Sequence, residues 1–521
     1  MGADGGADPG TDDSIVTVLD DLAETSGDRP FAKFPETELT VAEIAERSRW
    51  IAAGLSRLGV RKGDRVGVML YNRPAFVEAF FGTLRTGAKF VPVNVSLKGE
   101  DLDHVLSDAA PTVMVVGPDC LDNYGEAAHD VEHRFGLEER RPDGADRFET
   151  LVAETEPPAV DLSSRTPASI TYTSGTSGLP KGVVLPHGAY PAAGAEIGKR
   201  YGLAAGDTVY TPQPAFHING QMVIAEALMA GVPFALDPWF SKSRFWRRVE
   251  RYEATVLQIA GSVGEILYNE TDQPDNTLRV ASVSGNVELK RNFGQKFDCR
   301  IIAGYGLTES AGFVTFGSVD DPAIESEGEP IGYIDVAIVD QNHAQVPTGE
   351  QGEIVFRPTE PNVVFQRYHE APDQTLETIE NLWVHTGDVG YLDADGKLHF
   401  VERQSHFLRR KGENISVHEV ERVLNDHPHV RKAIVVGVEA GLADEEVLAV
   451  IRTDAGAAVE PAALLDFCAE RLAYFKVPRY VRFVEEFPTT ESKGNVRRSE
   501  LRDHGIDGCW DREAAGYELD R

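Results

Sequence analysis

Apolar residues near the start of the chain alternate between helical and strand-like spacing. From Ile44 to Leu58 they recur at helical intervals within LTVAEIAERSRWIAAGLSRLGV, which predicts a helix. From Val66 to Leu70 they alternate, which predicts a strand. A second helix is expected in NRPAFVEAFFGTLRTGA, closed by Gly87, and a second strand in KFVPVNV. Continued strand–helix–strand alternation predicts an α/β fold with largely parallel sheets.

The pattern changes twice in the last third of the chain. Short strands punctuated by glycine, such as IGYIDVAIVD and GEIVFRP, predict a β-rich subdomain over about 323–400. Helices and strands then alternate again, which predicts a small α+β domain over 403–521. We therefore expect a large N-terminal domain over 14–402, a disordered leader over 1–13 and a hinge near 403–406.

Composition narrows the class of protein and its partners. The chain has 521 residues, of which 42% are hydrophobic and 26% are charged. These values predict a soluble, globular protein of two to four domains. The formal net charge of −33 disfavours nucleic acids and anionic membranes as partners. An anionic substrate must therefore be held by local hydrogen-bond donors and cations.

Cysteine usage and the N-terminal segment predict a cytoplasmic protein. The four cysteines, Cys120, Cys299, Cys468 and Cys509, are widely scattered, without the spacing of a zinc site or a disulfide framework. The leader MGADGGADPGTDD is acidic and lacks the apolar run of a signal peptide, and no long uncharged apolar stretch follows.

The strongest chemical signal is the segment TYTSGTSGLPKGVVL. Glycines allow a tight turn that exposes backbone N–H groups, while hydroxyls and a lysine add donors and positive charge, so the loop is suited to nucleotide phosphates. It is not a Walker loop, because Gly182 follows the lysine where Ser or Thr would be needed. The predicted phosphate-binding residues are Thr173, Ser174, Gly175, Thr176, Ser177, Gly178 and Lys181.

With this loop, the chain resembles the acyl-adenylate-forming superfamily, in its acyl-CoA synthetase or AMP-dependent CoA ligase branch. The resemblance runs in order from about Leu39 to Leu501 and includes the segments PAFHINGQ, GYGLTES, WVHTGDVGYLDADG and VERQSHFLRRKGENISVHEVE. It implies two half-reactions: a carboxylate attacks ATP to give acyl-AMP, and the thiol of coenzyme A then displaces AMP. The implied cofactors are ATP or acyl-AMP, Mg²⁺ and coenzyme A.

The resemblance also implies roles for nucleotide-site residues. Thr308 would donate to the α-phosphate, and Glu309 would hold Mg²⁺, a hard cation that prefers oxygen ligands. Tyr305 would stack on adenine, and the backbone at Gly285 would lie along the adenine edge. Asp388 would accept from both ribose hydroxyls, since a carboxylate offers two acceptor oxygens.

Three further groups of residues follow from the same resemblance. Arg403 would contact the ribose, and His406, where the family commonly has aspartate, would mark the hinge. His217 would screen the acyl pocket from the thiol tunnel, although a buried histidine of the core is the alternative. The expected acyl pocket comprises Phe216, His217, Asn219, Gly220, Ala260, Gly261, Ala303 and Gly304. The expected coenzyme A surface comprises Arg409, Arg410, Lys411 and Gly412, although a solvated basic turn is an equal alternative.

The segment FPTTESKGNVRRSEL departs from the superfamily's closing pattern, Pro-x-Thr-x-x-Gly-Lys. Counted from Pro488 and Thr490, the glycine position holds Lys493 and the lysine position holds Gly494. In the superfamily this lysine bridges the carboxylate and the α-phosphate during adenylation. A shift of one residue along an extended segment turns a side chain to the opposite side. The sequence therefore favours a weakened or lost adenylation step.

Several functions remain open at this stage. An acyl-CoA synthetase that mainly transfers acyl groups from acyl-AMP to coenzyme A is the leading hypothesis, and a separate adenylating enzyme could then supply the adenylate. A complete ligase with a shifted lysine is the alternative within the same chemistry. An adenylation enzyme that loads a carrier protein and a non-catalytic nucleotide-binding protein are the rivals.

Overall fold

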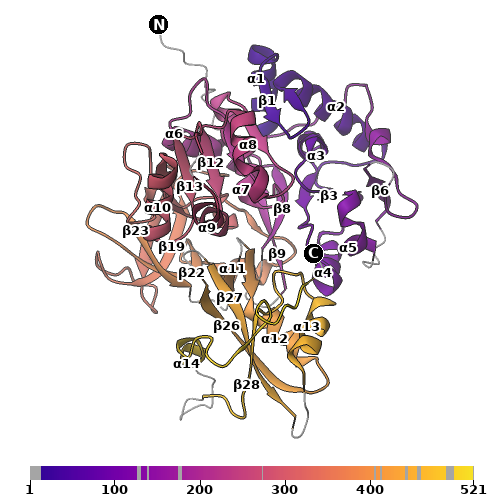
Figure 1. Ribbon diagram of the computed structural model, residues 1–521. Coiled ribbons are helices and arrows are strands. Elements are labelled where there is room, and N and C mark those ends of the chain that lie inside the picture. Colours follow the sequence, from indigo (N-terminus) through magenta and orange to yellow (C-terminus); the bar gives the residue numbers. More distant parts are fainter. Residues whose placement is uncertain are drawn as a thin grey trace.

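The structure, a computed structural model, describes residues 13–125, 131–137, 140–173, 179–272, 274–403, 407–410, 413–440, 444–454, 459–488 and 498–519. Most of the expected leader lies outside these ranges, so that prediction is untested. A large body carries the elements up to β23, and a smaller body below it carries α12, α13 and β26–β28 (Figure 1). No helix among the described residues is both long and apolar enough to pass through a membrane.

An eight-stranded sheet forms one half of the large body. Its central strands are parallel and largely buried, and the fully buried β5 carries valines on both faces, as is typical of strands covered by helices on both sides. Only β9 and β20 at one edge run antiparallel to their neighbours. In spatial order the strands are β20 (Arg367–Tyr368), β9 (Lys181–Pro186), β8 (Pro167–Thr173), β4 (Lys89–Pro92), β3 (Arg65–Met69), β5 (Val113–Val116), β6 (His133–Gly136) and β7 (Asp146–Arg147).

A seven-stranded sheet forms the other half. Its strands are parallel except for the edge pair β1–β2. In spatial order they are β14 (Arg300–Ile302), β13 (Val280–Val283), β12 (Val256–Ile259), β10 (Val209–Thr211), β11 (Phe234–Leu236), β1 (Pro30–Lys33) and β2 (Glu38–Thr40).

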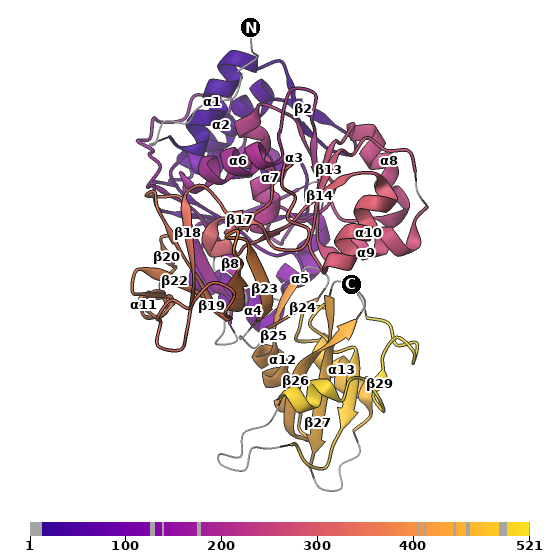
Figure 2. The same ribbon diagram turned by 90° about the vertical axis from the view of Figure 1, so that its left-hand side faces the viewer.

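Helices cover the two sheets and join them, as Figure 2 shows from the side. α6 contacts β9 of the first sheet and packs on α7, which contacts β10 and β11 of the second. The predicted first helix is confirmed as α2, whose start is a capping box of Thr40 and Glu43. The helices are α1 (Ile15–Ser26), α2 (Val41–Arg57), α3 (Pro74–Arg85), α4 (Gly99–Ala109), α5 (Leu121–Gly125), α6 (Ala189–Arg200), α7 (Ile218–Ala230), α8 (Lys242–Tyr252), α9 (Gly261–Glu270) and α10 (Val287–Phe297).

Antiparallel strands fill most of the segment over about 323–400 that we expected to be β-rich, and they begin before it at Gly304. A small sheet contains β15 (Gly304–Tyr305), β16 (Thr315–Phe316) and β17 (Glu329–Pro330). A five-stranded sheet contains β18 (Ile334–Val339), β19 (Gly352–Pro358), β21 (Ile379–Glu380), β22 (Trp383–Leu392) and β23 (Leu398–Arg403). The short helix α11 (Pro372–Thr378) precedes β21.

The C-terminal part has its own hydrophobic core. The buried cluster of the large body ends at Leu398, and a separate cluster runs from Leu408 to Val481. Its elements are β24 (Phe407–Arg410), β25 (Glu413–Ser416), α12 (Val417–Asn425), β26 (Val430–Ala440), β27 (Asp444–Thr453), α13 (Pro461–Ala469), β28 (Tyr480–Phe483), α14 (Arg498–Asp503) and β29 (Trp510–Asp511). The predicted α/β fold, with a β-rich subdomain and a small α+β domain, is confirmed.

Candidate functional site

The predicted phosphate loop joins two antiparallel strands. Thr173 ends β8 and lies opposite Lys181, the first residue of β9. β9 in turn pairs with β20, the edge strand of the eight-stranded sheet. Residues Ser174, Gly175, Thr176, Ser177 and Gly178 lie outside the described residues, and their phosphate-binding role stays a prediction.

Lys181, Tyr368 and Glu309 lie together at the base of this loop. The Lys181 Nζ atom lies 5.2 Å from the centre of the Tyr368 ring. The Tyr368 hydroxyl donates a 2.7 Å hydrogen bond to Oε1 of Glu309. Burial lowers the pKa of Lys181, while the charge of Glu309 acts to raise it. The cluster therefore places a cation and an oriented carboxylate at the mouth of the loop.

Sequence reasoning missed Tyr368, which lies in β20, a strand of two residues paired with β9. The Glu309 carboxylate is buried, follows Thr308 in a short 3₁₀ turn and has one oxygen engaged by Tyr368. A carboxylate is the ligand type that Mg²⁺ prefers, and Mg²⁺ completes its shell with substrate phosphates and water. The residues present therefore fit the metal that the resemblance implies.

A second group fixes the predicted ribose carboxylate. The Tyr305 hydroxyl donates a 2.7 Å hydrogen bond to Oδ2 of Asp388, and both side chains are buried. The Tyr305 ring lies nearly parallel to Phe400, with centroids 6.0 Å apart. Asp388 in β22 lies directly opposite Arg403 in β23. Two residues assigned to the ribose from separate motifs are thus neighbours across one strand pair.

Glu353 holds the turn that precedes Asp388, and sequence reasoning missed it. Its Oε1 accepts a 2.9 Å hydrogen bond from the backbone N–H of Gly387. Gly387 has a φ of 70°, a left-handed conformation that favours glycine. One carboxylate therefore holds the turn that directs Asp388, and only the pairing of β19 with β22 reveals it.

Most of the predicted acyl-pocket residues lie at the starts of two helices, while Ala303 and Gly304 follow β14. Phe216 and His217 precede α7, with ring centroids 4.6 Å apart, and Ala260 precedes α9. A Cβ at Gly220 would lie 2.6 Å from the Ala215 Cα, and a Cβ at Gly304 would lie 2.2 Å from the Phe316 ring. At these two positions the missing side chain permits close packing and leaves no open volume.

Contacts between the two bodies bring the small domain onto this site. His217 Nε2 lies 2.9 Å from Oε1 of Glu413, the first residue of β25. Burial acts to raise the pKa of Glu413, but the charge and hydrogen bond of His217 outweigh it and hold the pKa below its usual range. The histidine that we assigned to the acyl pocket is therefore half of an inter-domain pair.

A buried ionic triad closes the same interface. The Lys476 ammonium donates 2.5 Å hydrogen bonds to Oδ2 of Asp101 in α4 and to Oε1 of Glu419 in α12. Lys476 is 5% exposed, Asp101 4% and Glu419 1%. Burial disfavours the lysine's charge, but the two carboxylates outweigh it and raise its pKa. Because Asp101 belongs to the large body, this triad joins the domains.

Arg410 does not belong to the expected coenzyme A surface. It is 1% exposed, and its guanidinium donates to the carbonyl oxygens of Phe475 at 2.8 Å and Val477 at 3.2 Å. It also pairs with Glu446 at 2.6 Å. These contacts anchor β24 inside the small domain, so burial removes Arg410 from the predicted set.

Comparisons with known proteins give the family. The model of the AMP-binding enzyme family matches residues 19–369, and that of its C-terminal domain matches residues 419–493. The chain is 31% identical to crotonobetaine/carnitine–CoA ligase of Salmonella enteritidis PT4, over 94% of this chain and 99% of that protein. This chain belongs to the AMP-binding enzyme family. It is an acid–thiol ligase of the CoA ligase branch.

Two solved structures of a single AMP-binding enzyme are similar to the whole chain. A double mutant of o-succinylbenzoate CoA synthetase from Bacillus subtilis, bound with its product analogue, is 25% identical with a TM-score of 0.82, over 94% of this chain and 99% of that one. The same enzyme in complex with its acyl-adenylate intermediate is 25% identical with a TM-score of 0.67, over 94% and 98%.

Several residues expected from the AMP-binding enzyme family are not described by the structure. His406, Lys411, Gly412 and Lys493 lie outside the described residues, as do the side chains of Arg403 and Arg409. Their predicted roles in the hinge, in coenzyme A binding, in the ribose contact and in adenylation are untested.

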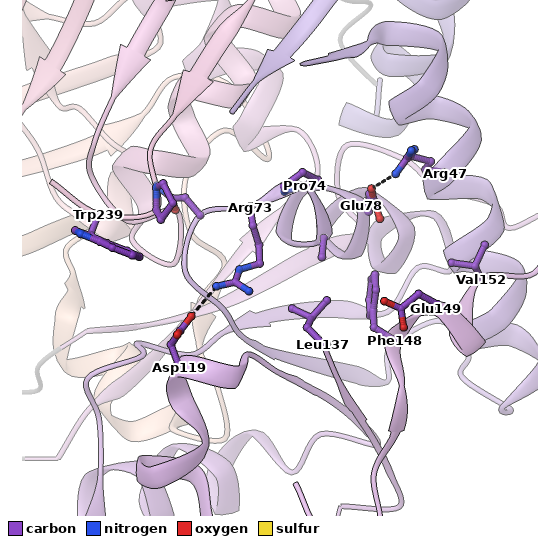
Figure 3. Close-up of a pocket in the computed structure, with 13 residues that line it drawn as sticks. Arg47, Arg73, Pro74, Glu78, Asp119, Leu137, Phe148, Glu149, Val152 and Trp239 are labelled. Atoms are coloured by element: carbon purple, nitrogen blue, oxygen red, sulfur yellow. Dashed lines mark hydrogen bonds and ion pairs between the residues drawn. The ribbon is translucent and has the colours of Figure 1, made fainter. Parts of the chain in front are cut away.

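A cavity of about 580 Å³ lies away from the nucleotide residues, next to the N-terminus of α3 (Figure 3). Its lining includes Trp239 and two ion pairs, Arg47–Glu78 at 2.8 Å and Arg73–Asp119 at 2.9 Å. Glu78 and Asp119 already pair with the two arginines, so an anion would have to compete with these carboxylates for the positive charge. The Lys181–Glu309 and Tyr305–Asp388 groups therefore stay the predicted nucleotide site.

Proposed function

We propose that this ligase converts a carboxylic acid to its acyl-CoA thioester through an acyl-adenylate, and that its adenylation step is weakened. The observation that carries the proposal is the closed inter-domain contact, in which Glu413 pairs with His217 while the nucleotide residues are assembled. The bound adenylate would then lie between the large domain and β25, where an incoming thiol meets its carbonyl carbon.

The similarity scores support this assignment of the closed arrangement. The TM-score is 0.82 for the product-analogue complex and 0.67 for the adenylate complex of the same enzyme, and each match covers 94% of this chain. We take the higher TM-score of the product-analogue complex as support for a thioester-forming arrangement of this chain.

In the proposed reaction, the thiol sulfur forms a bond to the acyl carbon, and the bond from that carbon to the phosphate oxygen breaks, releasing AMP. Asp388 holds the ribose, Thr308 donates to the α-phosphate and Lys181 offsets the phosphate charge. Positioning and preorganised charge of this kind are the main catalytic resources for such transfers. Mg²⁺ held by Glu309 would offset the charge of the ATP phosphates in the first half-reaction.

The displaced lysine is the reason why we propose a weakened adenylation step. A charged contact to the reacting phosphate is worth about 3–4 kcal/mol, or 10²–10³ in rate. With Gly494 in the lysine position, adenylation is expected to be slower by up to this factor. A separate enzyme that forms acyl-AMP would then be the partner.

The test measures the two half-reactions separately over a panel of acids that includes crotonobetaine, carnitine, o-succinylbenzoate and anthranilate. Pyrophosphate exchange reports adenylation, and thioester formation from supplied acyl-AMP reports transfer. We expect transfer to be faster than exchange, by up to about 10²–10³. Fast exchange by the unaltered protein would refute the weakened step, and absence of transfer would favour a carrier-loading or non-catalytic protein.

A paired variant isolates the geometry of the lysine. Exchanging the two residues, Lys493→Gly with Gly494→Lys, is expected to raise pyrophosphate exchange and leave transfer unchanged. The single substitution Lys493→Gly is the matched control and should not raise exchange. If the paired variant does not differ from this control, displacement of the lysine is not what limits adenylation.

A further inference from the structure

Two tight turns at the rim of the five-stranded sheet bring together side chains that the proposed function does not use. His343 lies in the turn after β18, Glu380 ends β21, and His385 lies in β22. One ligand atom from each of these three side chains lies within 4.8 Å of the other two. Two imidazoles and a carboxylate are a ligand set that suits zinc and disfavours Mg²⁺ or Ca²⁺.

The spacing of these atoms is close to that of a coordinated ion. His343 Nδ1 lies 3.1 Å from Oε2 of Glu380. Zinc bound at about 2.0–2.1 Å by tetrahedral ligands separates its ligand atoms by roughly 3.3 Å. The rings of His343 and His385 have centroids 4.6 Å apart. Since the His343 and Glu380 side chains are 33% and 48% exposed, solvent reaches the cluster and small rotations can bring the third ligand in.

A carboxylate already orients the least exposed of the three ligands. Oε2 of Glu353 lies 2.9 Å from Nδ1 of His385, whose side chain is 12% exposed. This contact leaves Nε2 of His385 to bind a cation. A carboxylate on the second nitrogen of a ligating histidine is the usual support of zinc sites, where it sets the tautomer and raises the basicity of the ring.

The backbone of both turns is held in an uncommon conformation. His343 has a φ of 60°, and Asn381 and Leu382, which follow Glu380, have φ values of 53° and 67°. Residues other than glycine pay a steric cost in this left-handed region, and such positions are frequent at binding sites. Here the two turns direct His343 and Glu380 toward each other.

We propose that His343, Glu380 and His385 bind one zinc ion, with water in the fourth position and Glu353 as the orienting carboxylate. The ion ties the two turns to β22. Three residues further along β22 lies Asp388, and Glu353 also holds the Gly387 N–H, so the site adjoins the turn that directs the ribose carboxylate. The proposal is independent of which half-reaction the ligase performs.

The experiment titrates untagged, metal-free protein with zinc chloride in competition with a chromophoric chelator. We expect one zinc ion per chain with a Kd in the micromolar range or below. His343→Asn, a residue that tolerates the left-handed region, and Glu380→Gln, which keeps the side-chain shape, should each weaken binding at least tenfold. His133→Ala is the matched control, since it removes a histidine beside Glu132 on another face, and should change nothing.

The melting temperature and the X-ray absorption spectrum test the proposed zinc site independently of the titration. Zinc should raise the melting temperature of the unaltered protein and of His133→Ala, but not that of His343→Asn. The X-ray absorption spectrum of the zinc-loaded protein should show two imidazole ligands. Equal zinc affinity in the unaltered protein and both ligand variants would overturn the site, as would unaltered protein that binds zinc no more tightly than magnesium.

Discussion

The nucleotide residues of the large domain and the contacts between the two domains are held by different kinds of interaction. Around the nucleotide site, a tyrosine hydroxyl binds each acid, as Tyr305 binds Asp388 and Tyr368 binds Glu309. Between the domains, the main contacts are ionic, as in the Lys476 triad and the His217–Glu413 pair.

Hydrogen bonds within one domain and ionic contacts between domains suit two different requirements of the same enzyme. A nucleotide must be held in the same way throughout both half-reactions, and hydrogen bonds within one domain keep its site preorganised. Under the proposed two-step reaction the domain interface would open and close, and its contacts would need to be reversible. Ionic contacts are reversible because water and salt solvate the charges once the domains separate. The predictions below test this distinction, starting with the largest expected effect.

Removing Lys476 should have the largest effect on the interface. The variant Lys476→Met leaves the carboxylates of Asp101 and Glu419 buried without their shared cation. Breaking a buried ion pair from one side costs about 3–5 kcal/mol. We expect the free energy of unfolding, measured with urea, to fall by about this amount. The variant Asp101→Asn should slow thioester formation and leave pyrophosphate exchange unchanged, and an equal loss in both would contradict the role of the triad as an inter-domain contact.

At the nucleotide site, Asp388→Asn should weaken AMP binding in both arrangements of the domains. Hydrogen bonds to a charged group contribute about 1.5–3 kcal/mol, so calorimetry should show roughly 10- to 150-fold lower affinity. The variant Tyr305→Phe keeps the ring and removes only the hydroxyl that holds Asp388. It should cost less than Asp388→Asn, and a larger loss would mean that Asp388 is not the main ribose contact.

The His217–Glu413 pair should have a smaller effect that is specific to thioester formation. Its side chains are 36% and 19% exposed, and partly exposed pairs contribute up to about 1 kcal/mol. We expect Glu413→Gln to slow transfer from acyl-AMP by about two- to fivefold. A loss confined to pyrophosphate exchange would contradict the assignment.

The pH dependence of that effect follows from the lowered pKa of Glu413. A carboxyl group with a lowered pKa keeps its stabilising charge above the ordinary range near 4.3, and loses it as the pH falls through the lowered value. Glu413 therefore stays charged from about pH 5.5 to 8, and within this range the pair changes only with the charge of its partner, because His217 is cationic only when protonated. The ratio of transfer rates between the unaltered protein and Glu413→Gln should be largest at about pH 5.5 and fall as the pH rises through the ordinary histidine range near 6.5. A ratio that stays constant would contradict the ionic character of the pair.

The smallest effect is expected at the rim of the interface. Arg422 pairs with Glu100 across the domains, and both side chains are well exposed. Exposed pairs are screened and contribute little, so Arg422→Gln should change either half-reaction by less than about twofold, in rate assays at 50 and 300 mM salt. A strong effect would show that the buried triad is not the main stabilising contact of the interface.

Much of the fold and of the nucleotide site follows from local pattern. The periodicity of apolar residues predicts α2, β3 and α3, because a helix or strand buries one face or two at a fixed interval. The motifs around Thr308 and Asp388 predict nucleotide residues, and the structure shows how neighbouring side chains hold Glu309 and Asp388. Local pattern did not reveal Tyr368 or Glu353, since neither belongs to a motif and each acts through a strand pairing.

The sequence by itself determined the family, the order of the elements and the residue types available for nucleotide chemistry, because each of these depends on residues that are near one another in the chain. Only the tertiary structure decided which residues meet. Lys476 and Asp101 are separated by 375 positions, and Glu413 and His217 by 196. Burial also reassigned Arg410 to the small domain, and close packing filled the space at Gly220 and Gly304. Contacts of this kind depend on how folded elements dock, and no local spacing specifies them.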